Sequence, residues 1–152
     1  MPILETTNFG DISYTPQSVF EFPNGLPGFD HNRRFIPVQN PRTAPILFLQ
    51  SIEDGSLCFT TIPVRVLDPD YRLLLSEADL EALGYSPEAQ PQIGTDVLCV
   101  AVLSIRESGA TANLLAPIVV NLDNHKAVQA IAADSDYSHQ HRLFPQEAPV
   151  CS

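Results

Sequence analysis

Short apolar stretches, each closed by Pro, Gly, Asn or Asp, recur along most of the chain. Their length and their β-branched and aromatic content predict strands at residues 18–22, 34–38, 46–52, 57–64 and 71–75. Residues 96–105 (DVLCVAVLSI) are almost continuously apolar. Such a run is typical of a strand that is covered on both faces. The pattern predicts a mostly β fold, a compact antiparallel β-barrel-like single domain.

Two later segments flank a turn, and one segment is helical. Residues 111–122 and 126–133 lie on either side of Asp123-Asn124-His125, which favours a β-hairpin. The Ala-rich second segment also suits a helix, and local propensity does not decide between the two. Residues 76–84 (SEADLEALG) predict one short α-helix. Ser76 stands at the N-cap and Gly84 at the position after the last turn.

The stretch EFPNGLPGF, residues 21–29, predicts a turn rather than a strand. Pro23 and Pro27 have no N–H to donate to a ladder, and the Asn-Gly and Pro-Gly pairs tolerate positive φ. On composition alone, we expect this turn to be fixed to a core by three apolar side chains, those of Phe22, Leu26 and Phe29.

Composition limits the size of the protein and the kind of partner. The chain has 152 residues, of which 44% are hydrophobic, enough to fill the core of one domain. Eight Lys and Arg against 18 Asp and Glu give a formal net charge of −10. A negative surface opposes direct binding to nucleic acid and attracts basic proteins.

The cysteines and the chain ends predict a cytoplasmic protein. Cys58, Cys99 and Cys151 form no CxxC pair, and two of them lie in apolar runs, as free thiols do in a reducing compartment. The first residues lack the pattern of a secretory leader, and no run reaches the about 20 apolar residues of a membrane span. We expect the polar residues 145–152 to form a flexible tail.

The sequence lacks the common catalytic signatures, and we expect no cofactor. GxSxG, GxGxxG, GxxxxGK[ST] and HExxH are all absent. One cluster offers oxygen and nitrogen ligands for a divalent metal, and its members are Asp134, Asp136, His139 and His141. A metal-dependent hydrolase that uses this cluster is therefore one alternative, although such residues are also common in turns.

Acidic residues gather between positions 68 and 88. The carboxylates are Asp68, Asp70, Glu77, Asp79, Glu81 and Glu88, with Arg72 as the only cation among them. They predict either a solvated face or a docking face for a basic protein. Because exposed ion pairs contribute only about 0–1 kcal/mol each, a docking face also needs an apolar anchor, for which Tyr71, Leu73 and Tyr85 are candidates.

Six ordered blocks resemble one family, the flagellar assembly factor FliW. These blocks are EFPNGLPGF, FLQSIEDGSLCF, PDY, SEADLEALG, TANLLAPIVVN and DSDYSHQHRLF, and the resemblance as a whole covers about residues 8–144. The residues that match the family motifs are Phe22, Leu26, Phe29, Asn113, Leu114 and Asn121. The stretch LDNHKAVQA departs from the resemblance, because many relatives have several basic residues and a glycine there.

The resemblance implies a monomeric, non-enzymatic protein that switches between partners in the cytoplasm. Members of the family bind flagellin and the RNA-binding translational regulator CsrA, and they release flagellin translation from repression by CsrA. For the regulator, we favour the acidic face that contains Asp68, Asp70, Tyr71, Glu77, Asp79 and Glu81. A β-barrel interaction module with no link to flagella is the remaining alternative.

Overall fold

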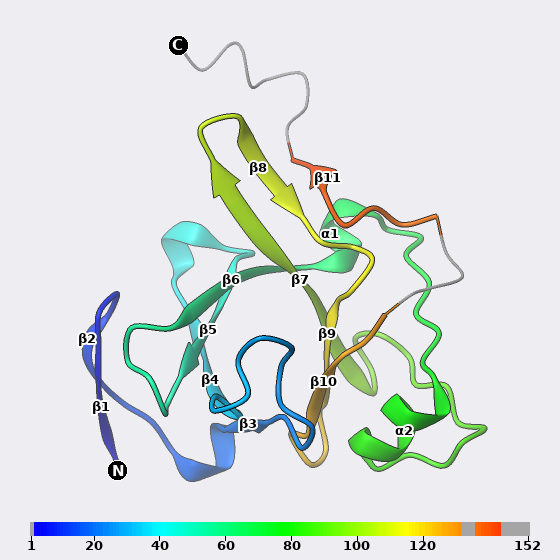
Figure 1. The fold of residues 1–152 in the computed structure, drawn as a ribbon, viewed down its shortest axis with the longest axis horizontal. Coiled ribbons are helices and arrows are strands. Elements are labelled where there is room, and N and C mark those ends of the chain that lie inside the picture. The colour runs from blue at the N-terminus through cyan, green and yellow to red at the C-terminus, as the bar shows by residue number, and fades with distance from the viewer. Residues whose placement is uncertain (1, 132–135, 144–152) are drawn as a thin grey trace.

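The structure, a computed structural model, describes residues 2–131 and 136–143. Eleven strands lie within these residues: β1 (Ile3–Thr6), β2 (Gly10–Ser13), β3 (Phe20–Glu21), β4 (Arg34–Gln39), β5 (Leu47–Ser51), β6 (Cys58–Pro63), β7 (Val97–Arg106), β8 (Gly109–Ala112), β9 (Ile118–Asn121), β10 (Ala127–Gln129) and β11 (His141–Arg142). The helices are α1 (Val64–Leu67) and α2 (Glu77–Leu83), with 3-10 turns at Pro16–Ser18 and Pro41–Thr43. Figure 1 shows their arrangement.

The main sheet is antiparallel and curls toward closure. Its strand order is β10-β9-β7-β6-β5-β4-β3, and β8 and β11 extend it beside the second half of β7. The two ends of this order meet at one point, where the Glu21 amide donates to the His125 carbonyl at 2.9 Å. The sheet is thus barrel-like without forming a complete ring of strands. The predicted mostly β, antiparallel fold is confirmed.

Strand β7 separates two hydrophobic cores. Val97, Cys99 and Ala101 pack into one cluster with the helices and the segment that joins them. Leu98, Val100 and Val102 alternate with them and face the interior of the curled sheet. Residues with period 2 point to opposite faces of a strand, so an unbroken apolar run is needed where both faces are covered. The prediction of a doubly covered strand at 96–105 is confirmed for the first part of β7, but it is wrong at the end, where Ser104 and Ile105 are exposed.

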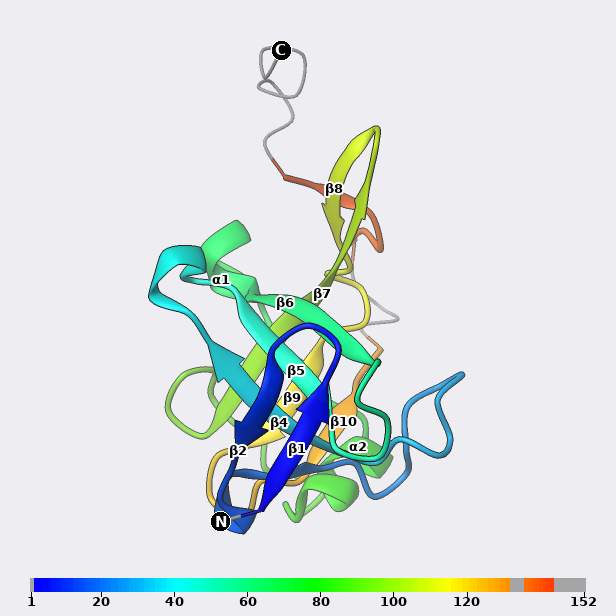
Figure 2. The same ribbon diagram turned by 90° about the vertical axis from the view of Figure 1, so that its left-hand side faces the viewer.

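The end of β7 leaves the body of the protein as a hairpin with β8. Leu103 pairs with Ala112 and Arg106 with Gly109, and β11 pairs with the other edge of β8. Figures 1 and 2 show this hairpin projecting beyond the curled sheet. The first half of β7 is thus central to the main sheet, and its second half is part of a projecting hairpin.

Helix α2 has the start and the end that the sequence predicts. The Ser76 hydroxyl oxygen accepts from the Asp79 amide at 3.1 Å, and Gly84 follows the helix with φ of 91°. The one-turn helix α1 was not predicted. Residues 57–64 were expected to form one strand, but β6 ends at Pro63 and α1 begins at Val64.

The predicted strand at 71–75 is wrong, although its backbone is extended. Side chains satisfy this backbone in place of a neighbouring strand. The Leu75 amide donates to Oε1 of Gln90, and Nε2 of Gln90 donates back to the Leu75 carbonyl. The Arg72 amide donates to the Tyr137 hydroxyl. The apolar residues of this segment favoured a strand, but strand pairing depends on a neighbour that the local sequence does not reveal.

The hairpin around residues 123–125 and the N-terminal hairpin of β1 and β2 had different outcomes. The hairpin around residues 123–125 is confirmed, since β9 and β10 pair on either side of it, and the Ala-rich segment is a strand over Ala127–Gln129. Residues 132–133 of that segment lie outside the described residues. The hairpin of β1 and β2 was not predicted. It contacts the β5–β6 turn, where the Thr7 amide donates to the Gly55 carbonyl and the Glu5 backbone fills the space of a Cβ at Gly55.

Among residues 2–131 and 136–143, no helix is both long enough and apolar enough to cross a membrane. The predicted flexible tail, residues 145–152, lies outside the described residues.

We predict that the free energy of unfolding falls above about pH 9. Burial raises the pKa of the Cys99 thiol from 9.0 to about 12. Burial also raises the pKa of the Tyr71 hydroxyl above its ordinary 10.0. Both groups stay neutral in the folded protein where the unfolded chain ionises, so the stability they contribute is complete below pH 9 and is lost as the pH rises.

Urea unfolding at intervals from pH 7 to pH 11 measures this loss. In Cys99→Ala the decline should be smaller, because the contribution of the Cys99 thiol is removed. A wild-type stability that does not change up to pH 11 would contradict the prediction.

Candidate functional site

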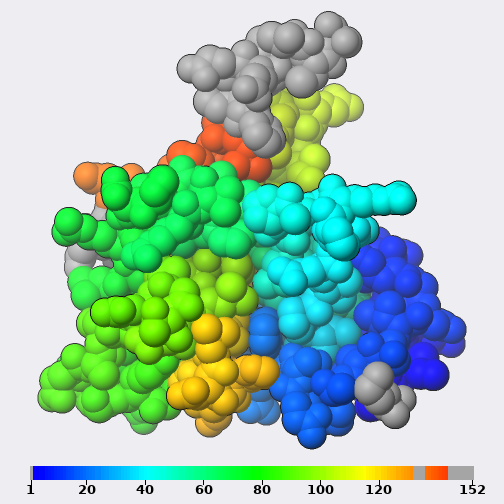
Figure 3. Space-filling view, turned by 180° about the vertical axis from the view of Figure 1, so that it is seen from behind, coloured from blue at the N-terminus to red at the C-terminus, as the bar shows by residue number. Residues whose placement is uncertain are grey.

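The α2 carboxylates do not all face the same way. Glu77 and Glu81 are four residues apart, so they share one helix face, and both are exposed. Asp79 is half-buried and lines a small pocket of about 230 Å³ with Asn24 and Gly25 of the turn at 21–29. The exposed carboxylates of the helix are therefore Glu77 and Glu81, which we call the α2 acidic pair. Figure 3 shows the segment containing α1 and α2 (green) as one continuous side of the molecule.

Asp68 and Asp70 lie in a turn at the opposite end of the segment that leads to α2. The Asp68 carboxylate accepts from the Asp70 amide at 3.0 Å, which closes the turn. In Figure 1 the extended residues 71–76 run from this turn down to α2. The structure thus places Asp68 and Asp70 on the same side of the molecule as the acidic pair, but it does not bring them together into one cluster.

Tyr71 is a core residue rather than an exposed anchor. It has no exposed surface, its hydroxyl donates to the Leu114 carbonyl at 2.6 Å, and its ring stacks on Tyr137 with centroids 4.2 Å apart. A partner docking on the surface does not reach it. Leu74 is instead the apolar side chain that this segment presents, with 68% of its surface exposed. The sequence could have indicated this. In an extended segment successive side chains point to opposite sides, so if Tyr71 and Leu75 point inward, Leu74 points outward.

The turn at 21–29 is fixed by the side chains that the sequence indicated. Phe22 and Leu26 are buried in the interior of the curled sheet, and Phe22 packs edge-on against Phe35. Phe29 is different, because 38% of its surface is exposed. Its ring packs edge-to-face with the Phe59 ring, with the ring centroids 5.2 Å apart. Gly25 and Gly28 both have positive φ, as the turn requires.

The three later motif residues hold loops to the core. Asn113 accepts from the amides of Leu115 and Ala116, and Leu114 is buried. Asn121 is buried, and its Nδ2 donates to the Leu83 carbonyl at 2.8 Å at the C-terminus of α2. These contacts explain the residue types at these positions by structure alone.

An open groove of about 640 Å³ lies between the β7–β8 hairpin, β11 and the turn at 21–29. We call it the hairpin groove. Its lining residues come from six strands and four loops: Leu26, Pro27, Phe29, Phe59, Val102, Ser104, Arg106, Ser108, Gly109, Thr111, Asn113, Ile118, Gln129, His139, Gln140 and Arg142. Sequence reasoning missed this groove, because its residues are brought together only by the pairing of β7, β8 and β11.

The proposed metal cluster is only partly described. Asp134 lies outside the described residues, while Asp136, His139 and His141 lie within them. Within the described ranges, no three His, Cys, Asp or Glu side chains come close enough to hold a metal ion together. His139 instead lines the hairpin groove, and His141 is half-buried in β11.

Comparison with protein families gives a match over nearly the whole chain. A family model described as FliW protein matches residues 3–143. A flagellar assembly factor FliW from Desulfitobacterium hafniense (strain DSM 10664 / DCB-2) is 32% identical over 143 residues, which are 94% of this chain and 91% of the relative. A protein of the same name from Pseudothermotoga lettingae is 36% identical over 140 residues, or 89% of this chain and 84% of the relative.

A solved structure agrees in fold. A crystal structure of the flagellar assembly factor FliW superimposes with a TM-score of 0.82 and has 32% sequence identity. The match covers 96% of this chain and 99% of the other. The shared fold therefore includes both cores and the projecting hairpin region rather than a fragment of the sheet.

We predict that Asn121→Ala destabilises the protein by about 1–3 kcal/mol, because it leaves the buried Leu83 carbonyl with one fewer donor. Asn124 is the matched control. Its Nδ2 donates to the same carbonyl at 3.0 Å, but the residue is exposed. Asn124→Ala should cost less, because water can replace its contact. Equal losses in urea unfolding of the two variants would contradict this assignment.

Proposed function

We propose that this chain, which belongs to the FliW family and is a flagellar assembly factor, acts by binding two protein partners in turn in the cytoplasm. One is flagellin, and the other is an RNA-binding translational regulator of the CsrA type. While flagellin is bound, the regulator is left to repress flagellin translation. Secretion of flagellin frees the factor, which then binds the regulator and relieves the repression.

The observation that carries this proposal is the family match over residues 3–143. The flagellin role rests on the family resemblance alone. For the regulator, the charge of the chain adds a physical argument. A protein that binds messenger RNA has cationic surface, and a formal charge of −10 attracts such a surface. Binding is therefore a sufficient mechanism, and no catalytic step is required.

The α2 acidic pair is the surface we assign to the regulator. Glu77 and Glu81 share an exposed face, and Glu88 is exposed in the loop after the helix. Leu74, exposed just before the helix, supplies the apolar contact that exposed ion pairs need in order to hold a partner. Carboxylates docked beside an RNA-binding site would also repel phosphate, so the factor need not occupy that site to oppose RNA binding.

A gel-filtration experiment tests the whole proposal. The purified protein is mixed with flagellin and with a CsrA-type regulator, separately and together, at two salt concentrations. We expect a complex with each partner, displacement of the regulator when flagellin is added, and weaker regulator binding at high salt because exposed charges are screened. Failure to bind either partner would identify an interaction module without a flagellar role.

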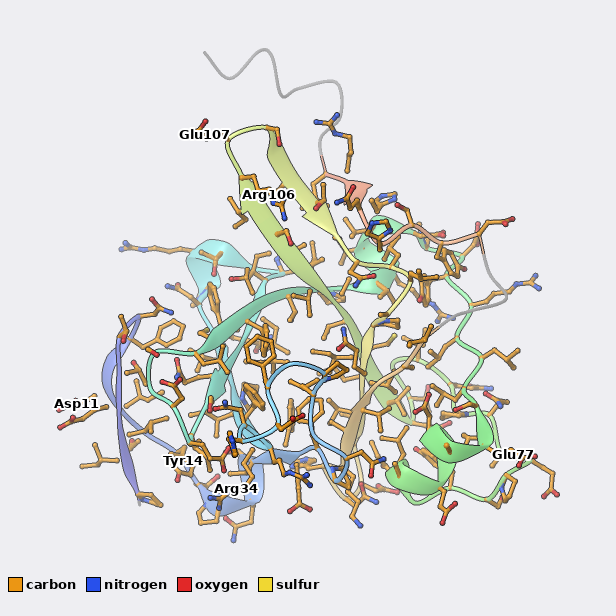
Figure 4. All side chains as sticks on the ribbon, viewed as in Figure 1. Asp11, Tyr14, Arg34, Glu77, Arg106 and Glu107 are labelled. Carbon is orange, nitrogen blue, oxygen red and sulfur yellow. The ribbon has the colours of Figure 1, made fainter. Side chains whose placement is uncertain are left out.

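We predict that the double substitution Glu77→Lys and Glu81→Lys weakens binding of the regulator by about tenfold or more at low salt, since it replaces attraction with repulsion. The matched control is Glu5→Lys with Asp11→Lys, which makes the same change of net charge on the N-terminal hairpin. Figure 4 shows Asp11 and Glu77 on opposite sides of the molecule.

The two double variants are compared by calorimetry against the regulator. An equal loss of affinity in both would mean that net charge, rather than the α2 acidic pair, governs the interaction.

A further inference from the structure

The hairpin groove has a charge opposite to that of the protein as a whole. Two arginines, Arg106 and Arg142, line it together with His139. No Asp or Glu of the described residues is among its lining residues, although the chain has 18 such residues. In a protein with a formal charge of −10, this groove is thus a local site where a negative group is attracted rather than repelled.

One of the two arginines of the groove has a side chain without a partner in the described part of the protein. The Arg106 guanidinium makes no hydrogen bond or salt bridge with any residue that the structure describes, whereas the Arg142 guanidinium donates to the Ser108 carbonyl at 3.1 Å. Figure 4 shows Arg106 within the β7–β8 hairpin, with Glu107 farther out at its tip. A guanidinium offers planar paired donors that match a carboxylate, so an unpaired one beside a groove is suited to such a group.

The other end of the groove is apolar. Pro27 and the partly exposed ring of Phe29 form one wall there. The Phe59 ring packs against the Phe29 ring with centroids 5.2 Å apart. Val102 continues this surface along β7. Ser104 and Arg106 follow it on the same face of the strand, because every second residue of a strand points the same way. Moving along one strand face, the lining changes from aliphatic to hydroxyl to cationic within five residues.

We infer that the hairpin groove binds an acidic protein segment in which carboxylates stand next to an aliphatic or aromatic side chain. The apolar side chain contacts Phe29 and Val102, and the carboxylates pair with Arg106 and Arg142. A nucleic acid would also bring negative charge, but it would meet the field of a strongly acidic protein with only two arginines to oppose it. The partner chemistry is thus opposite to that proposed for the α2 acidic pair, and the inference does not depend on the identity of the two partners proposed above.

A displayed library of random twelve-residue peptides provides the probe. Selection is carried out on the wild-type protein and, in parallel, on Arg106→Glu. We expect peptides with Asp or Glu next to Leu, Ile or Phe to be enriched on the wild type and lost on the variant. Basic peptides, which the acidic faces would retain, should survive on both. Absence of acidic peptides from the wild-type selection would overturn the inference.

A selected peptide is then measured by fluorescence anisotropy. We expect Arg106→Glu to weaken its binding by about tenfold or more and Arg106→Lys by less, because the charge is kept while the paired donors are lost. Phe29→Ala should also weaken binding. Arg42→Glu, the same change at an exposed residue outside the groove, is the matched control and should leave the affinity unchanged.

Three results would overturn the inference. One is equal binding of a peptide in which every Asp and Glu is replaced by Lys. Another is an equal effect of Arg106→Glu and Arg42→Glu. The third is a labelled oligoribonucleotide that binds as tightly as the peptide and is lost in Arg106→Glu, which would make the groove a nucleic-acid site. Thermal unfolding of each variant shows whether it is folded, and binding of the CsrA-type regulator by Arg106→Glu separates a failure of this inference from a failure of the proposed function.

Discussion

The pairing of β7 with three other strands is the constraint on which the rest of the structure depends. Its first half pairs with β9 and its middle with β6, while its second half pairs only with β8. Because side chains alternate along it, the same ten residues divide the protein into two cores and then extend as an arm. Both surfaces to which we assign partners are fixed to it. The helical layer packs on one of its faces, and the hairpin groove opens along the other.

Side-chain amides hold the structure together where strand pairing stops. Gln90 donates to and accepts from Leu75 as a paired strand would, and Asn121 donates to the last turn of α2. Gln50 is buried in β5, and its Nε2 donates to the carbonyls of Ser51 and Leu57 across the β5–β6 turn. Buried backbone groups must find partners, and here three amides supply them at positions where a loop lies against the core.

The sequence predicted local structure well and long-range assembly less well. Strand β7 and helix α2 were both predicted, because a few neighbouring residues are enough to indicate each of them: the apolar run in β7 and the capping residues of α2. Residues 71–75 have the alternation of a strand, but a strand needs a neighbour, and Gln90 takes its place. Tyr71 was proposed as an exposed anchor. Its burial was not foreseen, because its hydroxyl donates to the Leu114 carbonyl, 43 residues away in the sequence. The hairpin groove was missed for the same reason, since Arg106 and Arg142 line one groove only because β8 pairs with both β7 and β11.

The short strands at the two ends of the main sheet limit how another molecule can attach. β3 has two residues and β10 has three, and β3 reaches the turn before β10, where the Glu21 amide donates to the His125 carbonyl. Along β4, the edge that continues beyond β3 contains Pro37, which has no amide hydrogen to offer. At these two ends of the main sheet, the described strands therefore offer an incoming chain no long backbone edge. Edge-to-edge pairing with another chain is disfavoured at these two ends, where recognition is left to side chains.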